Sequence, residues 1–274
     1  MPYVMSVLLV VGLLSLAAAE EASAPAPLRL VAQAIGSSAS GGGAEGSALY
    51  VGGRGLITDE LVSGMFLNPT SGTLGRYEAT LQYCTLIFHV GHDTAVGHGV
   101  MAAFGVTDWI EVGASGLLVD LPGKDDQPTV GGPTARVRLL KDEGWQPEVS
   151  VGGVFLFGDE ALEKRTVYVA ASKGIKVSDS GPIRSARVHA GFRQAWVEVG
   201  KDGSFAFVGG EIELPKYVFA VAEVSNKSGG ADRIPWAAGI QVRHPAGYGF
   251  TLAGVQTGTL KSLGVYVGVG ISFQ

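Results

Sequence analysis

Apolar and polar positions alternate with a period of two along most of the chain, and the pattern is clearest at its end, in residues 262–273. A period of two places alternate side chains on opposite faces of a strand, whereas a helix would scatter them around its axis. One face of the predicted closing strand is apolar and includes Val265, Val267, Val269, Ile271 and Phe273. A strand of this length exceeds the average for a soluble sheet and is sufficient to cross a bilayer.

The same alternation predicts further strands upstream. They begin at Arg76 and cover, in order, residues 76–89, 97–106, 110–120, 135–139, 145–157, 164–173, 184–197, 203–213, 215–225, 234–243 and 247–256. With the closing strand the total is about twelve, and ten or fourteen remain open. The fold class that we predict is all-β, an antiparallel up-and-down transmembrane barrel.

The pairing of these strands is predicted from their short connections. The expected opposite pairs are His89–His98, Tyr83–Phe104, Phe104–Val112, Val106–Ile110, Leu139–Trp145, Val242–Tyr248 and Ile240–Phe250. A slip of one residue would turn a strand inside out, so agreement between faces supports the assignment. Short loops at 107–109, 140–144 and 243–247 then share one side, expected to be periplasmic, and longer loops at 121–132 and 225–233 share the other. Four aromatic residues fall at the periplasmic boundary as half of a girdle: Tyr77, Trp145, Tyr217 and Tyr248.

Composition supports a membrane location. Hydrophobic residues make up 46% of the chain and charged residues 16%, yet no run beyond the first twenty residues approaches a membrane-spanning helix. Only helices and closed barrels satisfy every backbone polar group in lipid, so a barrel is expected. The single cysteine, Cys84, excludes an internal disulfide, and the net charge of −5 gives no basic face for nucleic acid.

The N-terminal part is expected to lie outside the barrel domain, which we place at 75–274. Residues 1–19 resemble a secretory leader, with an apolar core at 7–16 that is too short to span a bilayer and three alanines before Glu20. Residues 20–74 begin as a flexible segment rich in Ala, Gly, Ser and Pro. For residues 48–74 a lumen plug, an extra strand and a periplasmic arm all remain open.

The closing strand, with its alternate apolar residues and Phe273 near its end, resembles the last strand of Gram-negative outer-membrane barrels of porin-like type. The resemblance implies a location in the Gram-negative outer membrane, contact with its lipids and recognition by the barrel-insertion machinery. That class also contains phospholipases, lipid A acyl hydrolases and omptin-like proteases. The serine and asparagine of the lipolytic enzymes are missing around His98, and Asp93 has no second carboxylate pair, so we expect no enzymatic activity.

Three histidines are the weak candidates for a metal site. His89, His92 and His98 lie close in sequence beside Asp93, and imidazole with carboxylate is a ligand set for zinc. The predicted register instead turns His89 and His98 outward at the rim of the barrel. We favour rim histidines and expect neither a metal nor a cofactor.

Polar side chains on the inward faces are the candidate lumen lining. They are Arg76, Glu78, Glu111, Arg136, Arg138, Glu148, Arg187, His189, Arg193, Gln241 and Arg243. In a wide barrel the excess of arginine would favour passage of polar or anionic solutes, whereas in a narrow one the charges pair and fill the lumen. A small porin-like channel and a filled structural or assembly barrel therefore both remain open, as does the oligomeric state.

Overall fold

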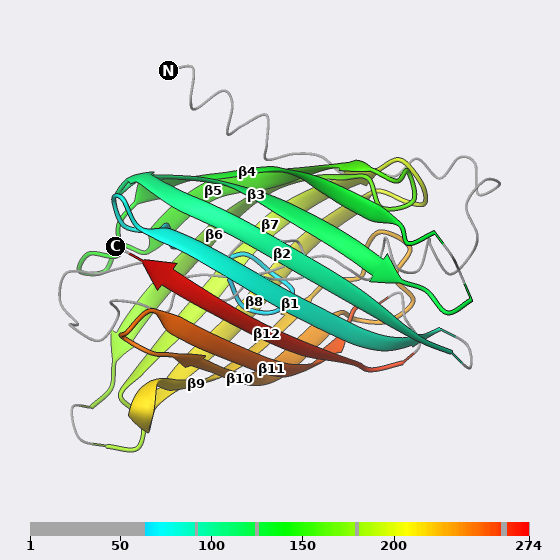
Figure 1. The fold of residues 1–274 in the computed structure, drawn as a ribbon. Helices are drawn as coiled ribbons and strands as arrows, with labels where there is room; N and C mark the ends of the chain where they lie inside the picture. Colours follow the sequence, from blue (N-terminus) through cyan, green and yellow to red (C-terminus); the bar gives the residue numbers. More distant parts are fainter. Residues whose placement is uncertain (1–63, 91–92, 124–125, 179–180, 259–261, 274) are drawn as a thin grey trace.

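The computed structural model of the chain describes residues 64–90, 93–123, 126–178, 181–258 and 262–273 (Figure 1). The described residues form twelve strands and one short 3₁₀ turn, η1 (Pro215–Tyr217). The strands are β1 (Ala79–Val90), β2 (Asp93–Thr107), β3 (Ile110–Asp120), β4 (Thr129–Leu140), β5 (Glu148–Gly158), β6 (Lys164–Lys176), β7 (Ser185–Val197), β8 (Gly203–Leu214), β9 (Val218–Ser225), β10 (Trp236–Arg243), β11 (Tyr248–Gln256) and β12 (Gly264–Phe273). The predicted leader and most of the predicted flexible segment lie outside the described residues.

The twelve strands close into a single barrel. Each strand pairs antiparallel with its neighbours in sequence, and β12 pairs with β1 to complete the ring. The strands run at a tilt to the long axis of the barrel (Figure 1), as closure requires. The predicted all-β antiparallel barrel and its number of about twelve strands are confirmed. In the part of the chain that the structure describes, no helix has the length and apolar character needed to cross a membrane.

The two ends of the barrel differ in their connections. We call the end where β1 begins and β12 finishes the first end, and the opposite one the second end. Residues 108–109, 141–147, 177–184, 215–217 and 244–247 connect strands at the first end. Residues 91–92, 121–128, 159–163, 198–202, 226–235 and 257–263 do so at the second. The three short loops that were predicted to share one side all lie at the first end. The two longer loops that were predicted on the other side both lie at the second end.

The outer wall of the barrel is apolar. On β12, Val265, Val269, Ile271 and Phe273 are exposed and Val267 is half-buried, while Tyr266 between them points inward and is buried. Outward charged side chains such as Asp120 and Arg165 lie close to strand ends. Such a wall exposes apolar side chains to whatever surrounds the barrel, which is the pattern of a lipid-facing surface.

A polar group interrupts this outer wall on β1 and β2. The hydroxyl of Tyr83 lies 2.7 Å from Nδ1 of His98, and Thr85 donates a hydrogen bond of 2.9 Å to the same tyrosine oxygen. The two rings are also stacked. The two hydroxyls and Nδ1 of His98 are therefore paired with one another, which reduces the cost of placing them on an apolar wall.

The predicted register between β1 and β2 is wrong by four residues. Tyr83 lies opposite Val100 instead of Phe104, and His98 lies opposite Thr85 instead of His89. The reason is the connection, because Val90 pairs with Asp93 and leaves only two residues between the strands. A shift by an even number keeps every side chain on its predicted face.

Three other predicted pairings can be compared with the structure. Phe104 lies opposite Val112 as predicted, but a bulge between Gly105 and Thr107 moves Ile110 opposite Thr107. The predicted Leu139–Trp145 pair is wrong, because Trp145 lies in the turn before β5 and Leu140 pairs with Val149. On β10 and β11 the prediction is wrong by two residues, since Val242 lies opposite Phe250 and Ile240 opposite Leu252.

Residues 64–75, the interior segment, lie inside the barrel (Figure 1, cyan). The segment begins with a turn in which Met65 N donates to Asn68 O at 3.2 Å, and Met65, Phe66 and Leu67 are buried. The described part of residues 48–74 thus lies within the ring of strands, and the choice among the three alternatives predicted for residues 48–74 stays a prediction. The segment leaves the interior at Gly75 and continues into β1.

A close backbone approach fixes the point where the interior segment leaves the barrel. Gly105 N donates to Glu78 O, and a Cβ atom on Gly105 would lie only 1.9 Å from Gly75 O. We expect Gly105→Ala to lower the free energy of unfolding by about 1–3 kcal/mol, because backbone would have to move. Equilibrium unfolding in detergent measures this. Gly116→Ala on β3 is the control, since its Cβ would meet nothing closer than Val100 Cγ1 at 3.5 Å; equal losses for both variants would contradict the expectation.

Candidate functional site

The inner wall of the barrel changes character along its axis. Towards the first end the inward side chains are charged or polar, and they surround the interior segment. Towards the second end β1, β3, β4, β5, β10 and β11 instead present apolar, buried side chains, namely Leu86, Phe88, Leu117, Val119, Val130, Leu156, Ala237 and Val255, whereas β6 and β9 keep buried polar side chains there, such as Lys164 and Ser225. The candidate site is the set of charged and polar side chains that contact the interior segment.

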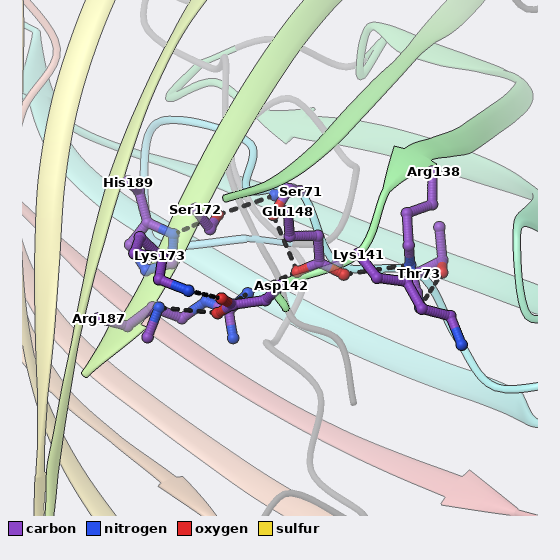
Figure 2. A network of polar contacts seen from close by, with 12 residues as sticks. Ser71, Thr73, Arg138, Lys141, Asp142, Glu148, Ser172, Lys173, Arg187 and His189 are labelled. Atoms are coloured by element: carbon purple, nitrogen blue, oxygen red, sulfur yellow. Dashed lines mark hydrogen bonds and ion pairs between the residues drawn. The ribbon is translucent and has the colours of Figure 1, made fainter. Parts of the chain in front are cut away.

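Glu148, at the start of β5, is the centre of the charged network in Figure 2. Its carboxylate lies 3.1 Å from Arg138 Nε and 2.5 Å from Arg187 Nη2, and it accepts a hydrogen bond of 3.0 Å from the hydroxyl of Ser71. All four side chains are nearly inaccessible to solvent. One buried carboxylate thus neutralises two arginines and holds the interior segment through Ser71.

Asp142 closes the network at the first end of the barrel. It lies in the connection between β4 and β5, and its carboxylate pairs with Lys173 and accepts Gly174 N at 2.8 Å. Arg187 lies 3.8 Å from the same carboxylate. The connection is therefore tied to β6 and β7 across the rim (Figure 2).

Glu223 on β9 fastens the first half of the interior segment. Phe66 N donates to Oε1 at 2.6 Å, Leu67 N donates to the same oxygen, and Asn68 Nδ2 donates to Oε2 at 2.8 Å. Asn68 Oδ1 in turn accepts from the Ser225 hydroxyl at 3.1 Å. A single buried carboxylate therefore satisfies three donors from consecutive residues of the segment.

Arginines and another glutamate fasten the second half of the segment. Arg136 donates to the carbonyl oxygen of Gly72, and Arg138 donates to the hydroxyl of Thr73. Leu74 N donates to Glu111 Oε2 at 2.8 Å. Since Arg136 and Arg138 lie on β4 and Glu111 on β3, the segment is held by strands on the opposite part of the wall from Glu223.

His189 on β7 connects the segment to a second ion pair. Its Nδ1 atom lies 2.8 Å from the Ser172 hydroxyl, which also accepts Ser71 N at 3.3 Å. Its Nε2 atom lies 3.9 Å from Glu211 Oε1, and Arg243 pairs with the other oxygen of that carboxylate. The serine, histidine and glutamate resemble a hydrolytic triad in composition, but the serine hydroxyl lies against the interior segment, where it fastens Ser71.

The predicted lumen residues lie inside the barrel with one exception. Glu78, Glu111, Arg136, Arg138, Glu148, Arg187, His189, Arg193, Gln241 and Arg243 are all buried on the inner wall. Arg76 is exposed, and its guanidinium donates to the Tyr77 hydroxyl and stacks on that ring. The prediction for Arg76 is wrong because Tyr77 has a positive φ of 63°, which breaks the extended backbone between Arg76 and β1.

Several acidic residues of the site were not predicted. Glu211, Glu213 and Glu223 are buried on the inner wall, and Asp142 pairs with two cations. The glutamates lie on β8 and β9, where apolar residues occupy both faces, so the alternation did not identify an inward side. Phe207 on β8 and Phe219 on β9 are both buried. Counted in steps of two along each strand from these phenylalanines, all three glutamates fall on the inward face.

The two candidate histidines that the structure describes are each close to a neighbouring hydroxyl. His89 lies 3.1 Å from the Thr94 hydroxyl and His98 pairs with Tyr83, while His92 lies outside the described residues. Among the described residues, no group of three potential ligands lies close enough to hold a metal ion.

The four predicted girdle residues all lie at the first end. Tyr77, Trp145 and Tyr248 are exposed, and Tyr217 is half-buried with its ring edge against His244, which stacks on Tyr248. Their common end agrees with the prediction; whether a membrane boundary lies there stays a prediction.

Comparisons with known proteins give little beyond the barrel itself. No family model matches the chain, and no curated protein matches it. Among solved structures it is similar to a triple mutant of the Rh. blastica porin, with 10% sequence identity and a TM-score of 0.31, over 72% of this chain and 99% of that one. The fold is established by the strand pairing: the chain is an all-β protein that folds as a closed antiparallel barrel.

Proposed function

We propose that the protein is an outer-membrane channel for small polar solutes that the interior segment holds closed. The observation that carries the proposal is the fastening of residues 64–75 by charged side chains from several strands of the wall. A permanently filled barrel requires only packing, whereas buried charges that grip a separate segment form a contact that can be released as a unit.

The wall is of mixed sign, which changes the expected solute. Arg138 and Arg187 pair with Glu148, and Arg243 pairs with Glu211. Because these cations are matched by buried carboxylates, the proposal drops the preference for anions that the sequence predicted and keeps polar solutes.

Glu223→Ala is expected to open the channel. The substitution removes the acceptor of three hydrogen bonds from residues 66–68. Hydrogen bonds to a charged group contribute about 1.5–3 kcal/mol each, so the loss shifts the closed population by at least about tenfold. We expect the entry of small polar solutes into liposomes that hold the variant to rise by a similar factor over the natural protein.

The matched control is Glu198→Ala, which removes the acid of an exposed pair with Arg165. It should leave solute entry unchanged. A heat-dependent gel shift verifies that each variant is folded. A folded Glu223→Ala protein that admits no more solute than the natural one would contradict the channel.

The second candidate is a filled structural or assembly barrel. The apolar, buried inner wall towards the second end favours it, because such side chains pack into a core. If the barrel is permanently filled, no folded variant should admit solutes into liposomes. The solute-entry experiment with Glu223→Ala therefore distinguishes the two functions.

A further inference from the structure

We infer that solutes move along the uncharged part of the inner wall formed by β11, β12 and β1, and that this route takes uncharged, hydroxyl-bearing molecules in preference to ions. The inference rests on the proposed function and names its solute class. Hydrogen bonds fasten the interior segment to side chains between β3 and β10, where Gln241 Nε2 donates to Met65 O at 3.0 Å, while on β12 the Tyr266 ring lies 6.4 Å from the ring of Phe66. Release of the segment therefore leaves the wall of β11, β12 and β1 with its own polar groups intact.

Two buried polar atoms on this wall have no hydrogen-bond partner among the residues that the structure describes. Oε1 of Gln82 on β1 and the hydroxyl of Thr251 on β11 are both unpaired, although the side chains are 2% and 0% exposed. The amide of Gln82 is held from its other side, where Nε2 donates to the Thr80 hydroxyl at 3.1 Å. Buried polar atoms normally find a partner, so an unpaired acceptor and an unpaired hydroxyl mark a place for a donor from outside the chain.

Glycines occupy the strand that lies between these two polar groups. β12 separates β1 from β11, and its inward positions beside Gln82 and Thr251 are Gly270 and Gly268. A Cβ atom on Gly268 would lie 3.6 Å from Thr251 Cβ and 3.6 Å from the Tyr266 hydroxyl, so both side chains lie close to this glycine. An amide oxygen, a hydroxyl and the edge of an aromatic ring around a glycine floor suit a small molecule that carries hydroxyl groups.

The rest of the route disfavours ions. Above Gln82 the inward side chains of β1 are Cys84, Leu86 and Phe88, and those of β11 beyond Thr251 are Ala253 and Val255, all of them buried. An ion that crosses such a wall loses its hydration without gaining a charged partner, whereas an uncharged solute loses much less. The charged residues that would favour ions lie in the network that grips the interior segment.

The single cysteine of the chain reports on this route. Cys84 points inward on β1, two residues beyond Gln82, with Gly268 and Gly99 as its partners on β12 and β2. In the Glu223→Ala protein we expect a neutral methanethiosulfonate to modify Cys84 at least about tenfold faster than anionic or cationic reagents with the same reactive group, because the apolar wall excludes charge. In the natural protein all three should react slowly.

The results of the labelling and solute-entry experiments distinguish the proposed route from the proposed channel. Equal rates for neutral and charged reagents, or an unreactive Cys84 in a variant that admits solutes, would overturn the route and leave the channel standing. A folded Glu223→Ala protein that admits no solute would overturn the channel, and the route with it.

A second pair of variants tests the two polar atoms. In the Glu223→Ala background, Gln82→Leu with Thr251→Val should slow the entry of a small polyol by about tenfold, because the polyol loses both hydrogen-bond partners. Thr129→Val, at an exposed strand end on β4, should not slow it. A polyol rate unchanged by the double substitution, in protein with a normal gel shift, would overturn the role of Gln82 and Thr251.

Discussion

Replacing Glu148 with alanine is expected to lower the free energy of unfolding by about 3–5 kcal/mol, as for other buried ion pairs that lose one partner. The carboxylate holds Arg138 and Arg187 and accepts from Ser71, and all of them are buried. Its loss leaves two guanidinium groups without their shared counter-charge in a place from which they cannot reach bulk water. Equilibrium unfolding in detergent, followed by tryptophan fluorescence, measures the effect.

The control for Glu148 is an ion pair of the same chemistry in solvent. Arg165 and Glu198 pair on the outside of the barrel with both side chains close to half exposed. Glu198→Ala should therefore cost about 1 kcal/mol or less. If the two alanine variants lost similar stability, burial would not be what gives the interior network its strength.

Leu252→Arg is expected to cost about 2–4 kcal/mol in a lipid bilayer, the range for arginine in the middle of a lipid-facing barrel wall. Leu252 lies at the centre of β11, is 41% exposed, and has outward Ile240 and Val267 as its neighbours across the sheet. A guanidinium at this position has neither water nor a carboxylate beside it. Unfolding from lipid vesicles measures the cost.

Position along the strand provides the control for this second substitution. Ser204 is exposed at the second-end terminus of β8, where a long side chain reaches the interface, so Ser204→Arg should cost about 0–1 kcal/mol. A Leu252→Arg protein as stable as Ser204→Arg, or a natural protein that stays dispersed in buffer without detergent, would show that the apolar wall faces something other than lipid.

The errors in the predicted register have one physical cause. Alternation fixes which face a side chain occupies, and a shift by two or four residues leaves every face unchanged. The predicted pairs of Tyr83 and of Val242 are wrong by even numbers for this reason, while their outward orientation is right. Only the length and shape of the connection select among the even shifts, as the two residues between Val90 and Asp93 illustrate.

The candidate site was predictable only in part. Arg136, Arg138 and Glu148 lie on strands with a clear apolar face, so their inward orientation followed from the sequence. Glu211 and Glu223 lie on strands with apolar residues on both faces, because the inner wall there packs Phe207 and Phe219. Where the inward side chains are apolar as well, polarity no longer alternates along the strand. The sequence then does not show which face points inward.

The sequence by itself indicated an all-β barrel of about twelve strands and determined the face that most side chains occupy, since a period of two is a local property of the chain. The tertiary structure alone decided which charges meet and where residues 64–75 lie. Phe66 and Glu223 are 157 positions apart, and their contact depends on closure of the ring. Local patterns carry no information about such a pair, because its distance is set by every strand between them.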